Sequence, residues 1–309
     1  MAIQMLLMKN WQIGYLKTFN RYQLLRRVES IYEGLNQYLN IKQKMENMKN
    51  RVLVVPDVHG RTFWKEEVSK WLEDVDKVVF LGDYLDPYEY HLPDALFANL
   101  MEIIELKRRE PEKVVLLKGN HDEHYASRLF RELGGGSRMD VANWDRYHEV
   151  FSANRALFRL AYLEVVGGVP YVFTHAGLTA YWLSKVNETL WHIDDDELSV
   201  ADPAVIDRIN ALAWDNWGPE LLAVVGHCRS WFGGEKTGSI LWADIREHSL
   251  DKAPHEYGLD EVFQVFGHTR LDGEEEDMIR GDHLAMIDSQ KCFLIDDGIS
   301  VLQAKLAKR

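Results

Sequence analysis

The sequence predicts an α/β fold, and three observations support that prediction. From residue 51 onward, short runs of branched apolar residues alternate with stretches that carry apolar residues at helical spacing. A polar motif directly follows each of five such runs, and parallel α/β sheets place their ligands at strand ends. The chain has 309 residues, 46% of them hydrophobic, which suffices for one large domain and an appendage. We therefore expect the five motifs to meet at one edge of one sheet.

Six apolar runs define the expected strands, and two helices are expected between the first three of them. The runs, typical of buried strands, cover residues 52–55, 78–81, 114–117, 172–173, 262–266 and 292–295. The helices are expected over residues 63–72 and 94–109, with Asp94 capping the second. The inward face of that second helix is expected to carry Ala95, Leu96, Leu100, Ile103, Ile104 and Lys107.

Two later regions and the N-terminal region complete the order of elements. Residues 123–160 should be largely helical with a break at glycines 134–136, and residues 178–240 should mix helices with Gly- and Trp-rich loops. Residues 1–47 are basic, lack proline and carry apolar residues at three- and four-residue steps, which predicts an amphipathic helix. We interpret them as an accessory N-terminal helical extension. Packing on the remainder, self-association and a translation start at Met45 or Met48 are the alternatives.

Five short motifs follow the expected strands. They read Asp57-Val58-His59-Gly60, Gly82-Asp83-Tyr84-Leu85-Asp86, Gly119-Asn120-His121-Asp122, Thr174-His175-Ala176-Gly177 and Gly267-His268-Thr269. Each motif alone is weak evidence, but the ordered set is specific. Its carboxylate, amide and imidazole groups are numerous enough to hold two divalent metals. The residues expected at sharp turns that need positive φ and close backbone approach are Gly60, Gly82, Gly119 and Gly267.

The ordered set resembles the calcineurin-like metallophosphoesterase superfamily over roughly residues 50–300. Within it, the set is most similar to the branch of the Ser/Thr phosphoprotein phosphatases and the symmetrical diadenosine tetraphosphatases. The resemblance implies a four-layer sandwich, in which two packed mixed β-sheets are flanked by helices and covered by a helical and loop cap. It places the metallophosphoesterase domain at residues 48–309, with cap insertions at about 123–160 and 178–240.

The resemblance also implies a site and a mechanism. The implied cofactors are two divalent metal ions, with Mn²⁺ favoured and Fe or Zn as alternatives. The implied ligands are Asp57, His59 and Asp83 for the first metal, and Asp83 as a bridge with Asn120, His175 and His268 for the second. A metal-bridging hydroxide is the implied nucleophile. His121 matches the general acid that protonates the leaving group, and Asp86 matches the acid that orients it.

The chain departs from the protein phosphatases at one phosphate-binding position. Pro87 stands where those enzymes carry an arginine, so another arginine must bind the phosphate if any does. The candidate substrate-binding residues are Arg61, Arg229 and Arg246, and surface ion pairing is the alternative for each. Arg270 replaces a second metal-binding histidine of other branches, which supports the phosphatase-like branch. Asp122 replaces a glutamate.

The implied activity is hydrolysis of phosphate monoesters. A nucleotide or dinucleotide polyphosphate hydrolase, or a phosphodiesterase, is the first alternative, and a non-catalytic scaffold of the same fold is the second. The expected substrate is a phosphorylated small molecule, a nucleotide or a phosphoprotein, and Pro87 counts against the phosphoprotein. Aromatic residues of the cap keep a nucleotide substrate open, because an aromatic ring can stack on a base. They are Trp214, Trp217, Trp231 and Phe232.

Composition limits the class of protein. A formal charge of −13 and a pI near 5.4 argue against a general nucleic-acid binder. The cysteines Cys228 and Cys292 form no CxxC pair, so they are expected to be reduced, as in a cytoplasmic protein. No run approaches the ~20 apolar residues of a membrane span, and residues 1–8 lack the basic start of a signal peptide. We expect a cytoplasmic enzyme with no membrane partner, of unspecified oligomeric state.

Overall fold

The structure is a computed structural model that describes residues 50–302, apart from short internal segments. Those segments are residues 134–137, 195–196, 214–217, 231–232, 251–254, 272–276 and 297. The predicted extension over residues 1–47 and the glycine break at 134–136 therefore lie outside the described residues. So do the four cap aromatics, Trp214, Trp217, Trp231 and Phe232.

Two mixed sheets form the centre of the fold. The first has the order β11-β10-β1-β2-β3-β4, in which β1 to β4 are parallel and β10 runs antiparallel to β1. Its strands are β1 (Val52–Val55), β2 (Lys77–Phe80), β3 (Val114–Leu117), β4 (Phe158–Arg159), β10 (Phe293–Ile295) and β11 (Ile299–Val301). The second has the order β5-β6-β7-β9-β8. Its strands are β5 (Ala161–Val166), β6 (Val169–Thr174), β7 (Phe263–Phe266), β8 (Ile279–Arg280) and β9 (Leu284–Met286).

The expectation that all five motifs follow strands of one sheet is wrong. The first three motifs follow β1, β2 and β3, whereas the last two follow β6 and β7 of the second sheet. The chain leaves the first sheet after β4. It then forms an antiparallel hairpin of β5 and β6, and β6 pairs in parallel with β7. An apolar run identifies a strand but not its pairing partner, so the sequence pattern could not separate the two sheets.

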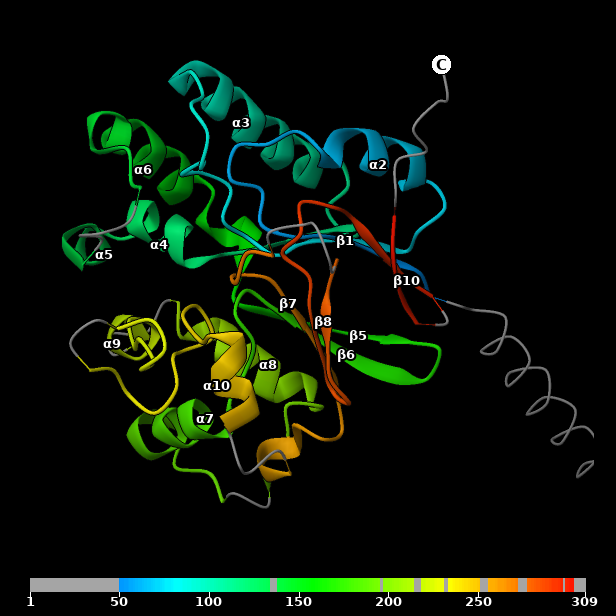
Figure 1. The fold of residues 1–309 in the computed structure, drawn as a ribbon, viewed down its shortest axis with the longest axis vertical. Helices are drawn as coiled ribbons and strands as arrows, with labels where there is room; N and C mark the ends of the chain where they lie inside the picture. The colour runs from blue at the N-terminus through cyan, green and yellow to red at the C-terminus, as the bar shows by residue number, and fades with distance from the viewer. Residues whose placement is uncertain are drawn as a thin grey trace, which may run out of the picture. The chain divides into compact units, whose positions relative to one another are not determined.

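The two sheets pack face to face, as the four-layer prediction requires. Alternate residues of the central strands, such as Val54 and Val79, lie in one buried cluster with Phe173 and Val265 of the second sheet. Their neighbours point the other way, toward helices. Both faces of these strands are therefore buried, which explains their uninterrupted apolar runs. Figure 1 shows α2, α3 and α6 on one side of the sheets and α7, α8 and α10 on the other.

The helices largely follow the predicted pattern. They are α2 (Trp64–Trp71), α3 (Pro93–Arg109), α4 (Asn120–Ala126), α5 (Arg128–Leu133), α6 (Trp144–Ala153), α7 (Ala180–Val186), α8 (Pro203–Ala211), α9 (Gly218–Leu222) and α10 (Ile245–Leu250). The two helices predicted between the first strands are confirmed as α2 and α3. The other described helical turns are Val141–Asn143, Arg155–Leu157, Asn187–Trp191 and Glu256–Gly258.

The predicted cap of α3 is wrong. The helix begins at Pro93, whose fixed φ suits the first helical position, and Leu92 is the N-cap, without a capping side chain. Asp94 instead forms an ion pair with Arg146 of α6. Ala95 is exposed, contrary to expectation, while the buried face carries Leu96, Asn99, Leu100, Ile103, Ile104 and Leu106.

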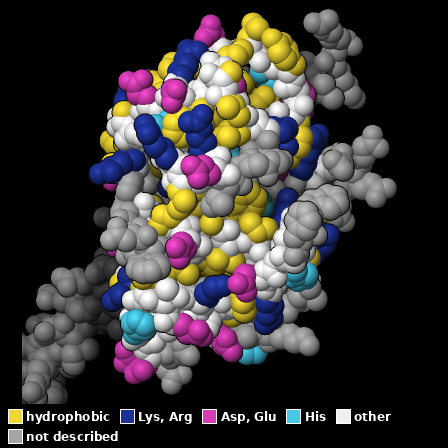
Figure 2. Space-filling model, turned by 90° about the vertical axis from the view of Figure 1, so that its left-hand side faces the viewer, with side chains coloured by type: hydrophobic (Ala, Val, Ile, Leu, Met, Phe, Trp, Pro, Cys, Tyr) yellow, Lys and Arg dark blue, Asp and Glu magenta, His cyan; other side chains and the backbone are white. Residues whose placement is uncertain are grey.

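The surface mixes charges of both signs. On the face drawn in Figure 2, Lys and Arg side chains are interspersed with Asp and Glu around a band of hydrophobic side chains. Within the described part of the chain, no helix combines the length and apolar character that crossing a membrane requires.

Candidate metal centre

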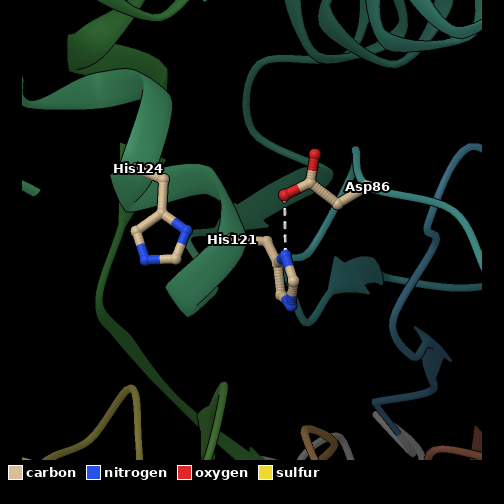
Figure 3. A group of neighbouring side chains, drawn as sticks. All are labelled: Asp86, His121 and His124. Carbon is tan, nitrogen blue, oxygen red and sulfur yellow. Dashed lines mark hydrogen bonds and ion pairs between the residues drawn. The ribbon is translucent and has the colours of Figure 1, made fainter. Parts of the chain in front are cut away.

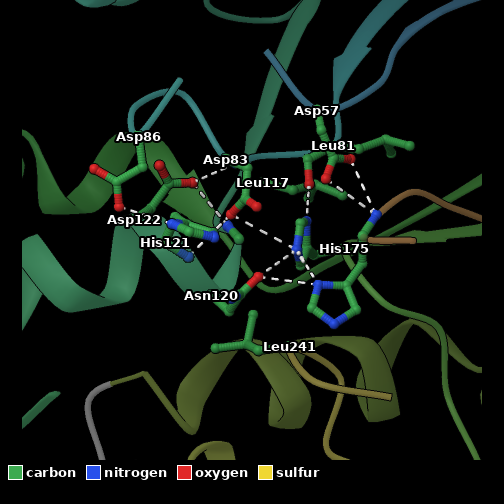
Figure 4. A network of polar contacts seen from close by, with 12 residues as sticks. Asp57, Leu81, Asp83, Asp86, Leu117, Asn120, His121, Asp122, His175 and Leu241 are labelled. Carbon is green, nitrogen blue, oxygen red and sulfur yellow. Dashed lines mark hydrogen bonds and ion pairs between the residues drawn. The ribbon is translucent and has the colours of Figure 1, made fainter. Parts of the chain in front are cut away.

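The loops after β1, β2, β3, β6 and β7 bring the six predicted metal ligands together. Figure 4 shows Asp57, Asp83, Asn120 and His175 directed toward one another from these loops. All six side chains are nine-tenths or more buried. The sequence prediction that distant motifs converge is therefore correct, although the motifs come from two sheets.

One group of donors consists of Asp57, His59 and Asp83, whose ligand atoms all lie within 4.8 Å of one another. The Nδ1 of His59 lies 2.9 Å from the carbonyl oxygen of Leu85, which can only accept, so Nδ1 carries the proton. The Nε2 of His59 then presents a lone pair 3.5 Å from the Asp83 carboxylate. Such a second hydrogen bond is how metal-binding histidines are held in one tautomer.

A second group of donors meets on the other side of Asp83. The Oδ1 of Asn120 lies 2.9 Å from Nε2 of His175 and 3.0 Å from Nδ1 of His268. These two nitrogens are 3.1 Å apart, and Nε2 of His175 is 3.7 Å from Asp83 Oδ1. Tetrahedral ligands at about 2.1 Å from one ion are about 3.4 Å apart. The Nδ1 of His175 donates to Leu81 O at 3.0 Å, which leaves Nε2 as an acceptor.

The protonation of these groups fits a cation. Burial lowers the pKa of His175 to about 3 and holds the pKa values of His59 and His268 well below their ordinary value. The imidazoles are therefore neutral and offer lone pairs, as metal ligands must. Burial also raises the pKa of Asp57 and of Asp83, because carboxylates crowd there away from water. A buried set of carboxylate and amide oxygens and imidazole nitrogens fits divalent ions such as Mn, Fe or Zn.

The backbone around these residues is strained. His59, Asp83, Asp86 and His268 all have φ between 44° and 67°, a region that costs about 1–3 kcal/mol per non-glycine residue. Asp122 helps to hold this conformation, because its carboxylate accepts the backbone N–H groups of Asp83 at 2.7 Å and Tyr84 at 2.9 Å. Local strain of this kind persists where the surroundings determine it, and it clusters at functional sites.

Two of the predicted turn glycines show the expected close backbone approach without the expected positive φ. Gly119 and Gly267 lack positive φ, so that part of the prediction is wrong. A Cβ on Gly119 would lie 2.0 Å from Asp83 Oδ1, and one on Gly267 would lie 1.9 Å from Asp57 Oδ1. These glycines are needed because the carboxylates approach the backbone closely.

His121 and Asp86 form the predicted pair. The Nδ1 of His121 lies 2.7 Å from Asp86 Oδ2, and the hydroxyl of Tyr125 donates to the other oxygen of the same carboxylate. Figure 3 shows the His121 ring directed at Asp86, with His124 on the same helix. The ring of His121 lies 5.2 Å from that of His59, so His121 stands beside the first donor group.

The structure places the three candidate arginines in different surroundings. Arg229 lies 2.8 Å from the hydroxyl of Thr269 and forms an ion pair with Asp244 at 2.8 Å. Arg246 pairs with the same Asp244 through a side chain that is 65% exposed, and it also bonds the carbonyl of Cys228. Arg61 pairs with Glu89 at 3.2 Å. Arg229 also donates to the backbone oxygen of His268, and Arg61 directly follows the motif that carries Asp57 and His59. Arg246 bonds Asp244 and Cys228 instead of a proposed ligand.

Three residues that the sequence analysis did not assign also belong to this region. Asp288 is buried, and its charge contributes to the raised pKa of Asp57. It follows the apolar run 284–287, so the signal that identified the other motifs could have identified it. Tyr125 and His124 follow His121 on α4, and nothing in the local sequence marks them.

Comparisons with known proteins agree with this geometry. The family model described as calcineurin-like phosphoesterase matches residues 50–270. Over 129 residues the chain is 26% identical to a protein phosphatase 2A catalytic subunit of Dictyostelium discoideum, a match covering 40% of this chain and 39% of that protein. The chain thus spans about two-fifths of that relative's length.

Two solved structures are similar over most of the chain, at low identity. A cold-active protein-tyrosine phosphatase of Shewanella sp. has a TM-score of 0.47 and 14% identity, over 82% of this chain and 80% of that one. A serine/threonine phosphatase of Saccharomyces cerevisiae has a TM-score of 0.43 and 16% identity, over 83% and 80%. The family match itself covers well over half of the chain and every predicted ligand. The chain therefore belongs to the calcineurin-like phosphoesterase family.

Proposed function

We propose that the protein hydrolyses phosphate monoesters at a centre of two divalent cations that share Asp83. The proposed ligands are Asp57, His59 and Asp83 for one cation and Asp83, Asn120, His175 and His268 for the other. The observation that carries this proposal is the convergence of Asn120 Oδ1, His175 Nε2 and His268 Nδ1 within 2.9–3.1 Å of one another, where the bond of His175 Nδ1 to Leu81 O leaves Nε2 with a lone pair. Imidazole and carboxylate donors favour Mn²⁺, with Fe or Zn as alternatives.

The proposed chemistry divides between the cations and the side chains. When bound, two divalent cations lower the pKa of water and neutralise charge on the phosphoryl oxygens. His121 is the proposed general acid: its Nδ1 is fixed by Asp86, so its imidazolium form carries the transferable proton at Nε2. The Asp86 carboxylate stabilises that imidazolium and is itself held by the Tyr125 hydroxyl.

Two further parts of the proposal concern the substrate and the cellular location of the protein. Arg229 is the proposed phosphate-binding arginine in place of Pro87, since it lies against His268 and Thr269. Hydrolysis of a nucleotide or dinucleotide polyphosphate is the second candidate, favoured by additional arginines beside His59. Both cysteines are free thiols, which supports a cytoplasmic location.

A hydrolysis panel tests the proposal. Mn²⁺-loaded protein is assayed beside Asp83→Asn on para-nitrophenyl phosphate, its bis-ester, a phosphopeptide and a dinucleotide tetraphosphate. We expect metal-dependent turnover, highest on a monoester, and its loss in Asp83→Asn because one carboxylate serves both cations. No turnover of any of these substrates by protein with two metals bound would instead support the non-catalytic scaffold.

A further inference from the structure

Three arginines surround one tyrosine beside the first donor group. The guanidinium carbons of Arg138, Arg270 and Arg61 lie 3.5, 4.5 and 5.4 Å from the centre of the Tyr88 ring. The Tyr88 ring in turn lies 5.1 Å from the ring of His59. We call Tyr88 and the three arginines the Tyr88 cluster.

Most members of the Tyr88 cluster closely follow the metal-site motifs in the sequence. Arg61 follows the first motif, Tyr88 follows Asp86 and Pro87, and Arg270 follows His268 and Thr269. Arg138 donates from Nε to the backbone oxygen of Asp86 at 3.2 Å. The cluster therefore lies next to both a proposed ligand, His59, and the loop that carries the partner of the proposed general acid.

Among the described residues, the three arginines of the cluster lie near two carboxylates. One of these carboxylates belongs to Asp288, which lies within electrostatic reach of Arg61, Arg270 and Arg229. The carboxyl of Glu89 is slightly buried, yet the hydrogen bond and charge of Arg61 and the charge of Arg270 lower its pKa. Of the cluster's arginines, Arg61 and Arg270 lie near both of these carboxylates. One of them, Asp288, is buried beside Asp57, and the other has a side chain that is 53% exposed.

The cluster is open to a ligand. Arg138 and Arg270 are exposed, and Tyr88 is 43% exposed. A guanidinium that stacks on an aromatic face keeps its N–H donors in the plane of the group, directed away from the ring. Donors in that arrangement match a phosphoryl group, which they can bind through paired hydrogen bonds.

The arginines lie beside different donor groups. The Tyr88 ring of the cluster lies 5.1 Å from the ring of His59, whereas Arg229 donates to the backbone oxygen of His268 at 3.3 Å. A single phosphoryl group held by Arg229 does not account for the other three arginines. An anion long enough to reach from Arg229 to the Tyr88 cluster would bind both sets of arginines.

We propose that the Tyr88 cluster is a subsite for a second phosphoryl group, so that the preferred substrate is a small molecule carrying two or more phosphoryl groups. This inference rests on the proposed phosphoesterase activity and specifies its substrate class. Pro87 offers no cation in this loop, and the Tyr88 cluster supplies cations at the neighbouring position.

The test measures discrimination between paired substrates. Wild-type protein with Mn²⁺ is assayed on α,ω-alkanediol bisphosphates of increasing chain length, each beside the monophosphate of the same diol. We expect a higher kcat/KM for the bisphosphate at one or more chain lengths, through a lower KM. In Arg138→Gln and in Arg270→Gln the ratio of the two kcat/KM values should fall by about tenfold, as loss of a charged hydrogen bond predicts.

The control is Arg146→Gln. Arg146 also stacks on an aromatic ring, 3.8 Å from the centre of Phe97, and pairs with Asp94, but it belongs to α6 and not to a motif loop. Its replacement should leave the ratio unchanged. Turnover of the monophosphates with equal kcat/KM for every bisphosphate, or an unchanged ratio in both arginine variants, would overturn the subsite while leaving the proposed function intact. Absence of turnover on all of these substrates would count against the proposed function itself.

Discussion

Two hydrogen bonds hold the Asp86 carboxylate between His121 and Tyr125. If His121 protonates the leaving oxygen, His121→Ala should retain metal and lose about 10²–10⁴ in kcat on an alkyl phosphate. The loss on para-nitrophenyl phosphate should be much smaller, because nitrophenolate departs without a proton. Steady-state kinetics on both substrates, with the metal content of the variant, provide the measurement. Equal losses on the two substrates would contradict the general-acid role.

Burial of His124 makes the stability of the fold depend on pH. Its side chain is buried, and neither ring nitrogen has a hydrogen-bond partner among the described residues. Its ring lies 5.9 Å from the rings of His121 and Trp242. Burial, and then the charge of His121, lower its pKa to about 4 from an ordinary 6.5. The unfolded chain therefore binds this proton first, and stability is lost as the pH falls from about 6.5 toward 4.

We predict that His124→Leu reduces the acid sensitivity of the fold. Between pH 7.5 and pH 5, the variant should lose about 2 kcal/mol less unfolding free energy than wild type, from the pKa difference alone. Urea unfolding of chelator-treated protein at both pH values measures this difference. His283→Leu is the control because His283 is exposed. A variant as acid-sensitive as wild type would show that His124 takes up its proton in the folded state as readily as in the unfolded chain.

At the scale of elements, the strand-to-loop junctions set the position of the ligands. The loop after β7 passes so close to Asp57 that only glycine fits at residue 267. We predict that Gly267→Ala displaces the Asp57 carboxylate, lowers metal affinity by at least about tenfold and destabilises the fold by about 1–3 kcal/mol.

Metal titration and urea unfolding of Gly267→Ala test this expectation beside Gly281→Ala. A Cβ on Gly281 would meet only Leu284, at 3.4–3.5 Å, which is ordinary contact. If the two variants bound metal equally well, the close approach at Gly267 would not control the position of Asp57.

The same scale shows what the sequence could predict. Strands such as β1 and β3 were predictable because both faces are buried, so their apolar runs are uninterrupted. The start of α3 was misplaced by one residue because Pro93, and not Asp94, determines it. Sheet membership was missed because pairing joins distant segments, for example Tyr171 to Phe263.

The site was predictable to a similar degree. The proposed ligands stand in motifs with local glycines, whereas the contact of Tyr125 with Asp86 joins residues 39 positions apart. The stacking of Arg138 and Arg270 on Tyr88 likewise depends on tertiary structure that no local pattern encodes. Residue types near the motifs could be read from the sequence, but their mutual distances could not.

For the whole molecule, the donors come from both sheets, so a bound cation would tie the two sheets together. We predict that Mn²⁺ raises the unfolding free energy by about 2.7 kcal/mol per site at a hundredfold excess over Kd. Urea unfolding with Mn²⁺ or with a chelator measures the increase. Asp83→Asn should show little of it, and an equal increase in that variant would indicate binding elsewhere.

The pairing of β1 with β10 has a consequence for biosynthesis. Val52 pairs with Ile295, so one side of this central strand is covered by a segment that is synthesised much later than the strand itself. While residues 293–301 are still inside the ribosome, the backbone N–H and C=O groups of β1 lack hydrogen-bond partners on that side. Such an edge is a template for association with other chains, and it stays exposed until β10 emerges from the ribosome.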